Sequence, residues 1–328
     1  MKKIIVSRLG SPEVLESREA AIPQPESDEV VIKVAFAGVG TIDAIMRAGK
    51  LREFNLQPPF TPGIEISGIV HSVGDNVEQF AIGQAVAAIM PPDGGYAEYV
   101  RAKQSLTTRL RSVKQLRAAA SLVNLTTAYL LFTDIARLQP EDLLVIHGAS
   151  GGIGTACIQV ARLLQPQSLV VATVRQPNKK PYVQSLGCKD VITVDSFLRG
   201  SNAENVYSLI VDPVGGDLRR ASITALKPYG RLLAIGNVSN DYETVVSSQQ
   251  LWLEGKTISG FNLALYAKLY PDQVQLAMKF IAGRLEDERL ALKEKLFSLS
   301  EVRQAHTYLQ SGALTGRVLL EINDVTLT

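Results

Sequence analysis

Apolar residues follow two different patterns along the chain, and the change falls near residue 121. Up to that point, β-branched runs at 29–39 and 66–74 end in glycine, and pairs such as Pro58-Pro59 separate the runs. From about residue 122, short apolar runs alternate with helical segments, which is typical of a doubly wound parallel sheet. The pattern therefore predicts a β-rich first part and an α/β second part.

The alternating part contains six predicted strands, and further elements follow it. The strands are Leu143–His147, Leu169–Val174, Asp190–Val194, Ser208–Asp212, Arg231–Ile235 and Thr257–Phe261. After about residue 265 the sequence predicts a helix, a strand, a second helix and a last strand, at 271–285, 294–299, 300–312 and 316–322. These elements predict a discontinuous first domain, 1–121 plus 265–328, with a second domain at 122–264 inserted into it.

Composition and charge exclude several classes of function. The 34 lysines and arginines nearly balance the 32 aspartates and glutamates, and they are scattered, so no nucleic-acid surface or anionic-membrane patch is expected. Cys157 and Cys188 cannot form a disulfide framework and fit a reducing compartment. The apolar run Ile4-Ile5-Val6 is too short for a signal peptide, and no run approaches membrane-spanning length. A cytoplasmic location is therefore expected.

A glycine-dense turn, VIHGASGGIGTACIQVARLL (145–164), joins the first strand of the alternating part to a helix. Gly148, Gly151 and Gly154 give the spacing GxxGxxG directly after the strand. Glycine lets the backbone approach a pyrophosphate closely, and the helix N-terminus offers free N–H groups and the positive end of its dipole. Many such turns are glycine-rich for packing alone, but the five strands that follow favour dinucleotide binding.

The end of the second strand indicates which dinucleotide is bound. An NAD site usually places Asp or Glu there, to accept a hydrogen bond from the ribose 2′-hydroxyl. This strand ends instead in TVRQPNKK, with Arg175 at its tip, Lys179 and Lys180 just beyond, and no carboxylate before Asp190. Because a guanidinium is a bidentate donor to a phosphate, the sequence favours an NADPH site over a solvated basic loop.

Segments spread over almost the whole chain resemble a known family. They occur in the family's order and spacing: GSPEVLE (10–16), PGIEISGIVHSVGDNVEQFAIGQAV (62–86), GGYAEYV (94–100), NLTTAYLLF (124–132), SLGCKDVI (185–192), DPVGG (212–216), LKPYGRLLAIGN (226–237) and TGRVLLEI (315–322). Together they resemble zinc-free members of the medium-chain dehydrogenase/reductase superfamily, and the chain is similar to quinone oxidoreductases and enoyl-thioester reductases. The resemblance implies a GroES-like β-barrel catalytic domain, a Rossmann domain for NADPH, and a homodimer.

The resemblance also implies which residues contact the cofactor. The pyrophosphate would lie on Gly151, Gly152, Ile153 and Gly154, and the 2′-phosphate would face Arg175 and Gln176. The nicotinamide half would lie near Asn124, the turn Ile235, Gly236, Asn237 and Val238, the segment Phe261, Asn262 and Leu263, and the basic position Arg317. Two of these residues have structural alternatives: Asn124 as the N-cap of the next helix, and Phe261 as a core side chain.

The sequence offers no metal site. Zinc-dependent relatives need a catalytic cysteine and a Gly-His-Glu segment, and that segment here is Gly63-Ile64-Glu65. The two cysteines and the three histidines, His71, His147 and His306, are dispersed, so no tetrahedral set of nitrogen and sulfur ligands is expected. His147 and Cys157 are interpreted as packing residues.

The proton donor for reduction is not identified. The enoyl-thioester reductases that the chain resembles carry an Asn, an Asp three residues on, and then a Tyr; the corresponding residues here are Gly40, Asp43 and Leu51. Asp43 fits helix capping at least as well as catalysis. A quinone takes protons on oxygen readily from solvent, so the missing acid affects it less.

The sequence therefore predicts an NADPH-dependent, zinc-independent reductase acting on a small electrophilic molecule, either a quinone or an α,β-unsaturated carbonyl. Two alternatives stay open. One is an enoyl-thioester reductase that uses water or another residue as its acid. The other is an NADPH-binding sensor or scaffold without turnover, which Gly40 and Leu51 would permit.

Overall fold

The chain divides into two compact units in its computed structural model, which describes residues 1–50, 56–90, 94–200, 205–241, 244–285, 287, 290 and 292–325. The first unit is Met1–Thr126 with Ala264–Thr328, and the second is Thr127–Leu263. Within the described residues no single helix is long and apolar enough to span a membrane, although one bent pair, Val113–Ala119 with Leu122–Ile135, passes that test jointly.

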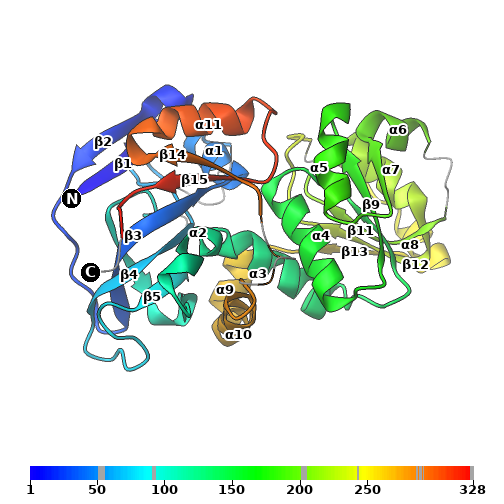
Figure 1. The fold of residues 1–328 in the computed structure, drawn as a ribbon. Coiled ribbons are helices and arrows are strands. Elements are labelled where there is room, and N and C mark those ends of the chain that lie inside the picture. Colours follow the sequence, from blue (N-terminus) through cyan, green and yellow to red (C-terminus); the bar gives the residue numbers. More distant parts are fainter. Residues whose placement is uncertain are drawn as a thin grey trace. The chain divides into compact units, whose positions relative to one another are not determined.

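The first unit is built on a seven-stranded sheet in the order β14-β15-β3-β4-β5-β7, with β6 also paired to β3, and on a separate pair β1-β2 (Figure 1). Only the β14–β15 pairing is parallel. The strands are β1 Lys2–Val6, β2 Leu15–Glu19, β3 Glu29–Val39, β4 Glu65–Val73, β5 Ala85–Ile89, β6 Tyr99–Lys103, β7 Thr107–Arg109, β14 Glu294–Ser298 and β15 Arg317–Glu321.

The long strand β3 organises this sheet. Its sequence EVVIKVAFAGV is apolar at almost every position, and nearly all of its residues are buried, as expected for a strand covered on both faces. It pairs with β6 through Glu29–Lys33, with β15 through Phe36–Val39, and with β4 through Val30–Ala37. Two register shifts in the β4 pairing add twist. One continuous strand can therefore pair with three partners.

Helices and single turns complete the first unit. The α-helices are α1 Thr41–Arg47, α2 Leu116–Ala119, α9 Leu263–Leu269, α10 Pro271–Ala282 and α11 Val302–Gln310, together with the start of α3 Leu122–Leu130. Short 3-10 helices lie at Pro12–Val14, Gln104–Leu106, Val113–Gln115 and Leu299–Glu301.

A buried arginine joins α1 to α11. Arg47 is 1% exposed, and its Nε donates to the Gly10 carbonyl at 3.1 Å. Its Nη1 lies 2.9 Å from His306 Nδ1, and its Nη2 donates to Gln310 Oε1 at 3.1 Å. Because a guanidinium only donates, His306 Nδ1 accepts, and the imidazole is neutral. Burial, with the Arg47 charge beside it, lowers the pKa of His306 to about 3.

The second unit is a six-stranded parallel sheet in the order β10-β9-β8-β11-β12-β13, with helices on both faces (Figure 1). The strands are β8 Leu143–Ile146, β9 Leu169–Val174, β10 Asp190–Thr193, β11 Tyr207–Asp212, β12 Leu226–Ala234 and β13 Thr257–Gly260. The helices are α4 Gly152–Leu164, α5 Lys180–Ser185, α6 Val194–Arg199, α7 Asp217–Ala225 and α8 Ser248–Glu254, with a π-helical turn at Leu131–Ile135 and a 3-10 turn at Pro177–Lys179.

The strand order places a switch point at the centre of this sheet. From β8 the chain winds outward through β9 and β10, and from β11 it winds the other way through β12 and β13. Loops leaving the carboxyl ends of neighbouring strands therefore diverge between β8 and β11, where open α/β sheets bind ligands. All six predicted strands are present with small differences at their ends. Val194 begins α6 instead of ending β10, because the Thr193 side chain caps that helix by accepting from Ser196 N.

His147, just past β8, is a buried structural residue. It is 0% exposed; its Nδ1 lies 2.9 Å from Thr173 Oγ1 and its Nε2 lies 2.8 Å from Ser222 Oγ. The Ser222 hydroxyl donates to the Leu218 carbonyl at 2.6 Å, so Nε2 carries the hydrogen and Nδ1 accepts from threonine. Burial lowers the pKa of His147 to about 4.

The three glycines of the turn after β8 have different structural reasons. Gly148 has φ +61°, a conformation that other residues rarely adopt. A Cβ on Gly154 would lie 2.6 Å from Ala149 Cα and closer still to the Gly148 carbonyl oxygen, so glycine is required for α4 to pack on the turn. A Cβ on Gly151 would meet only the Gly148 oxygen, at 3.5 Å. Neither conformation nor packing demands glycine at 151.

This difference predicts opposite outcomes for two alanine substitutions. Gly154→Ala forces backbone apart, and overpacking of this kind typically costs about 1–3 kcal/mol of unfolding free energy. Gly151→Ala adds a methyl group into open space at a helix N-cap and should cost less than about 1 kcal/mol. Urea unfolding of both variants measures the difference. Equal losses would show that Gly154 is not a packing constraint.

The two buried histidines predict a loss of stability in acid. Their native pKa values lie below the ordinary 6.5, so the unfolded chain takes up protons first. Their stabilisation is complete above about pH 6.5 and is lost as the pH falls toward 4, with a limiting slope of about 1.4 kcal/mol per pH unit for each histidine.

Variants isolate this contribution. His147→Gln and His306→Asn should each flatten the dependence of unfolding free energy on pH between about 6.5 and 4. The parent is the proper reference because the Asp43 carboxyl, whose pKa burial raises to about 6, acts in the opposite direction in every protein compared. An unchanged slope in either variant would contradict the assignment of a neutral imidazole at that position.

Candidate functional site

The second unit presents its predicted site residues at the carboxyl edge of the parallel sheet. The glycine turn follows β8, Arg175 and Gln176 follow β9, Ile235 to Val238 follow β12, and Phe261 follows β13. The N-cap residue of α4 is Gly151, which has no side chain to accept a hydrogen bond from the first turn. That turn also contains no acidic residue. The N–H groups of that turn are available to an anion.

The tip of β9 carries concentrated positive charge. Arg175 is exposed, whereas Lys179, at the end of the following 3-10 turn, is buried. Burial lowers the pKa of Lys179, and the positive charge of Arg175 lowers it further because the two cations repel each other. Asp190, the next carboxylate in the sequence, is the first residue of β10 and pairs in register with Val171 near the start of β9. It therefore lies at the amino ends of the strands, opposite the tip of β9.

A buried carboxylate fixes the loops after β11 and β12, and sequence analysis did not identify it. Asp212 is 0% exposed, and its Oδ1 accepts from the backbone N–H groups of Val214 at 2.7 Å and Gly215 at 2.9 Å. Its Oδ2 accepts from Arg219 Nε at 2.7 Å, and Arg219 Nη2 donates to the Gly236 carbonyl at 2.7 Å. The pair therefore anchors the loop that carries Asn237.

Asn237 has buried polar atoms without partners. Its side-chain oxygen occupies the space that a Cβ on Gly215 would take, so only glycine at 215, with φ +81°, accommodates it. Both its Oδ1 and its Nδ2 are buried and have no hydrogen-bond partner among the described residues. Such atoms are costly unless a ligand or water completes them. Of the neighbouring predicted contacts, Ile235 is half-buried, and Val238 is 52% exposed.

The first unit contains the residues expected to face the substrate. Gly40 is the N-cap of α1, and Asp43 is the third helical residue, so Asp43 does not begin the helix as the capping interpretation assumed. It reaches back instead: its Oδ2 accepts from Gly40 N at 2.7 Å, and its Oδ1 accepts from Gly63 N at 3.1 Å. Leu51 lies outside the described residues.

Burial dominates the electrostatics around Asp43. The carboxyl is 0% exposed, and burial raises its pKa to about 6 despite the two backbone donors and the Arg317 guanidinium nearby. The Tyr96 hydroxyl is also fully buried, and burial together with the Asp43 charge raises the pKa of Tyr96 well above its ordinary value. Because both groups are buried, neither can exchange protons directly with solvent.

Arg317 forms a buried ion pair with Glu65. The two side chains are 4% and 3% exposed, and Arg317 Nη2 donates to Glu65 Oε1. Burial lowers the pKa of Arg317 to about 10, and its Nε has no hydrogen-bond partner among the described residues. A Cβ on Gly38 would collide with both partners of the pair and lie 2.6 Å from the Ala120 carbonyl oxygen. Glycine at 38 is what lets the pair sit there.

The same carboxylate positions Asn124. Glu65 Oε2 accepts from the backbone N–H of Val123 at 2.8 Å, in the first turn of α3. That helix begins at Leu122, so Asn124 is its third residue, and the alternative of Asn124 as N-cap is wrong. Its Nδ2 is buried without a hydrogen-bond partner among the described residues. Asn124 is thus a second amide that a bound ligand would complete.

The donor chemistry does not favour a metal at these positions. Glu65 is committed to Arg317 and to Val123 N. Burial raises the pKa of the Cys157 thiol far above its usual range and that of Cys188 to about 12. In the part of the chain that the structure describes, no three His, Cys, Asp or Glu side chains form a possible metal group.

The remaining predicted contacts are placed less distinctively. Phe261 is half-buried rather than a full core residue, Asn262 is exposed, and Leu263 is half-buried at the start of α9. The backbone N–H of Phe261 donates to the Ala234 carbonyl at 3.1 Å, so the hydrogen bonding between β12 and β13 continues one residue past the end of β13. Gly152 and Ile153 are half-buried in the first turn of α4. Gln176 stands at the N-cap position of the 3-10 turn after β9, without a side-chain capping hydrogen bond.

Comparisons with known proteins agree with this arrangement. The alcohol dehydrogenase GroES-like domain model matches residues 26–112, and the zinc-binding dehydrogenase model matches residues 186–320. A quinone oxidoreductase of Pseudomonas aeruginosa is 30% identical over 97% of this chain and 99% of its own length. The prostaglandin reductase-3 of Mus musculus is 28% identical over 98% of this chain and 89% of its own length.

Solved structures show the same fold. A mycobacterial protein crystallised with NADPH has a TM-score of 0.86 and 25% identity, covering 98% of this chain and 99% of its own. The predicted fold class, a GroES-like domain together with a Rossmann domain, is confirmed. This chain belongs to the medium-chain dehydrogenase/reductase superfamily, among relatives of its quinone oxidoreductases.

Proposed function

We propose that this protein is an NADPH-dependent reductase that transfers hydride to quinones or to α,β-unsaturated carbonyls and needs no zinc. The observation that carries the proposal is the carboxyl edge of the second unit. There, a turn left open at Gly151 lies next to a strand whose tip carries Arg175 and Lys179 and no carboxylate. Similarity to quinone oxidoreductases, and to a protein crystallised with NADPH, supports it.

The residues present fit NADPH. Gly151 leaves space where any side chain would stand between a pyrophosphate and the N–H groups of α4. Arg175 and Lys179 supply the charge for a 2′-phosphate. The side-chain amide of Asn237, whose Oδ1 and Nδ2 are buried without partners among the described residues, fits the polar groups of the nicotinamide half. When bound, NADPH supplies the hydride.

Zinc independence rests on the side chains at the family's metal position. Ile64 stands where an imidazole ligand would be required, and neither cysteine is an accessible thiolate. Glu65, the one carboxylate of that segment, is already paired with Arg317. The protein's own contribution to the reaction is therefore binding and orientation rather than Lewis-acid activation.

The absence of a side chain at residue 40 favours quinones. Reducing a C=C bond needs a proton delivered to carbon, and Gly40 and the apolar Leu51 supply none. Asp43 is buried and accepts two backbone hydrogen bonds, so its carboxylate orients the start of α1. When a quinone is reduced, the protons are added to its oxygen atoms, and solvent can supply these protons.

The cofactor proposal predicts a selective loss of affinity. Arg175→Ala should weaken NADPH binding by at least about tenfold, because it removes a charge-assisted contact to the 2′-phosphate. NADH, which lacks that phosphate, should bind as in the parent. Nucleotide fluorescence titration measures both, and Arg199→Ala removes a matched exposed charge as the control. Equal affinity of the parent for NADPH and NADH would contradict the proposal.

The substrate proposal predicts an ordered set of rates. The parent should reduce p-quinones with a kcat/KM about a hundredfold or more above that for enoyl thioesters, which is the usual size of a general-acid contribution. The double variant Gly40→Asn with Leu51→Tyr should raise the enoyl-thioester value more than the quinone value. A Cβ at residue 40 meets its nearest neighbour only at 3.5 Å, so the change fits. Efficient enoyl-thioester turnover by the parent would overturn this prediction.

A further inference from the structure

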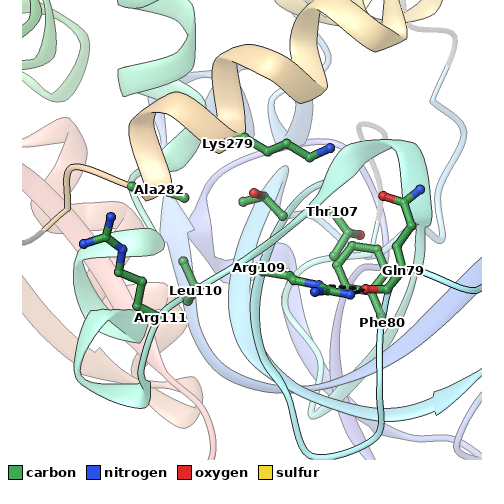
Figure 2. A pocket seen from close by; sticks show the side chains of 10 residues that line it. Gln79, Phe80, Thr107, Arg109, Leu110, Arg111, Lys279 and Ala282 are labelled. Carbon is green, nitrogen blue, oxygen red and sulfur yellow. Dashed lines mark hydrogen bonds between the residues drawn. The ribbon is translucent and has the colours of Figure 1, made fainter.

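A basic groove lies in the first unit, and none of its lining residues belongs to the candidate site described above. It has a volume of about 460 Å³ and is bounded by β7 and the end of α10 (Figure 2). We call it the β7–α10 groove. Its cationic lining residues are Arg109, Arg111 and Lys279. The other lining residues are neutral: Gln79, Phe80, Thr107, Thr108, Leu110, Ala282 and Gly283.

The cations of this groove differ from those elsewhere on the same unit. Arg101 and Lys103, for example, form ion pairs with a cluster of carboxylates, Glu26, Asp28 and Glu29. In the described ranges of the chain, the lining of the β7–α10 groove contains no carboxylate. Among the described residues, the three cations of the groove form no ion pair. Within the described residues, three cationic side chains therefore line the groove without a paired carboxylate.

Neutral groups hold two of these cations in place. Arg109 donates from Nε to the Gln79 carbonyl at 2.7 Å and from Nη2 to the same oxygen, and its guanidinium carbon lies 6.0 Å from the centre of the Phe80 ring. Lys279 Nζ donates to Gln275 Oε1 at 3.2 Å. In Figure 2 the Lys279 chain crosses above Thr107, and the Arg109 guanidinium lies below, against Phe80. Among the described residues, both cations therefore donate to neutral oxygen atoms rather than to a carboxylate.

The two walls are tied together by glutamines. The buried Gln115 accepts from the backbone N–H of Arg111 at 2.6 Å and donates to the Ala282 carbonyl at 3.5 Å, so it joins the segment after β7 to the last residue of α10. Gln275 Nε2 donates to the Gln104 carbonyl at 3.3 Å. The width of the groove is therefore set by the fold rather than by its charged side chains.

We propose that the β7–α10 groove binds a soluble small molecule that carries at least two negative charges on phosphate groups. A guanidinium presents a planar fork that matches phosphate oxygens, and an ammonium adds a point charge from the opposite wall. The volume is that of a small-ligand site. All lining residues belong to the first unit, whereas the glycine turn and Arg175 belong to the second. The proposal therefore does not depend on NADPH binding.

Calorimetric titration with inorganic pyrophosphate at low ionic strength tests the site. We expect one equivalent to bind, and we expect Lys279→Gln and Arg111→Gln each to weaken it by at least about tenfold. Both side chains are exposed, so the variants should retain the parent melting temperature. Two controls should bind pyrophosphate as the parent alone does: the variant Arg8→Gln, which removes an exposed charge outside the groove, and the parent with NADPH present in excess, which fills the nucleotide site.

Three results would overturn the proposal. The first is no binding of pyrophosphate by the parent. The second is unchanged affinity in both groove variants, and the third is loss of pyrophosphate binding when NADPH is present in excess, which would place the bound phosphate at the nucleotide site. Sedimentation of the parent with vesicles that carry a phosphomonoester lipid, without any heat from pyrophosphate, would likewise contradict a soluble ligand.

Discussion

The buried pair of Glu65 with Arg317 is the constraint on which the substrate side of this protein depends. It joins β4 to β15 across the first unit, and its second carboxylate oxygen fixes the start of α3 through Val123 N. Removing one partner of such a pair leaves an uncompensated charge, which typically costs about 3–5 kcal/mol. Gly38 belongs to the same constraint because any side chain there would collide with both partners. The placement of Asn124 follows from it.

The second unit uses a similar device for the nucleotide side. Asp212 and Arg219 connect the turn after β11 to the loop after β12, and through Gly236 they hold Asn237 against Gly215. In both units a buried carboxylate fixes the backbone beside an asparagine whose buried side-chain nitrogen has no partner among the described residues. Under the proposed function, such rigid placement orients the hydride donor and acceptor without a metal. The cost of the unpartnered amides is offset when the ligand binds.

Local signals explain what the sequence could predict, and distant partners explain what it could not. The strands and the glycine turn could be predicted because each depends on a pattern within fewer than about twenty consecutive residues. Arg175 could be predicted as a site residue because it stands directly after its strand. The partners Glu65 and Arg317 are 252 positions apart, and the local sequence around either residue does not indicate that they form an ion pair. The alternative of Asn124 as an N-cap failed because α3 begins two residues earlier, at Leu122 directly after Ser121. Asp43 was assigned to capping correctly in kind but not in position, since a glycine precedes the helix.

Hydride transfer is the central claim, and single-turnover mixing tests it most directly. Protein loaded with one equivalent of NADPH is mixed with excess p-quinone, and the nicotinamide absorbance and the reduced product are followed together. We expect the absorbance to disappear and one equivalent of hydroquinone to form. NADPH that stays bound and reduced with every quinone and enone tried would contradict the account, and the protein would then be a binding protein without turnover.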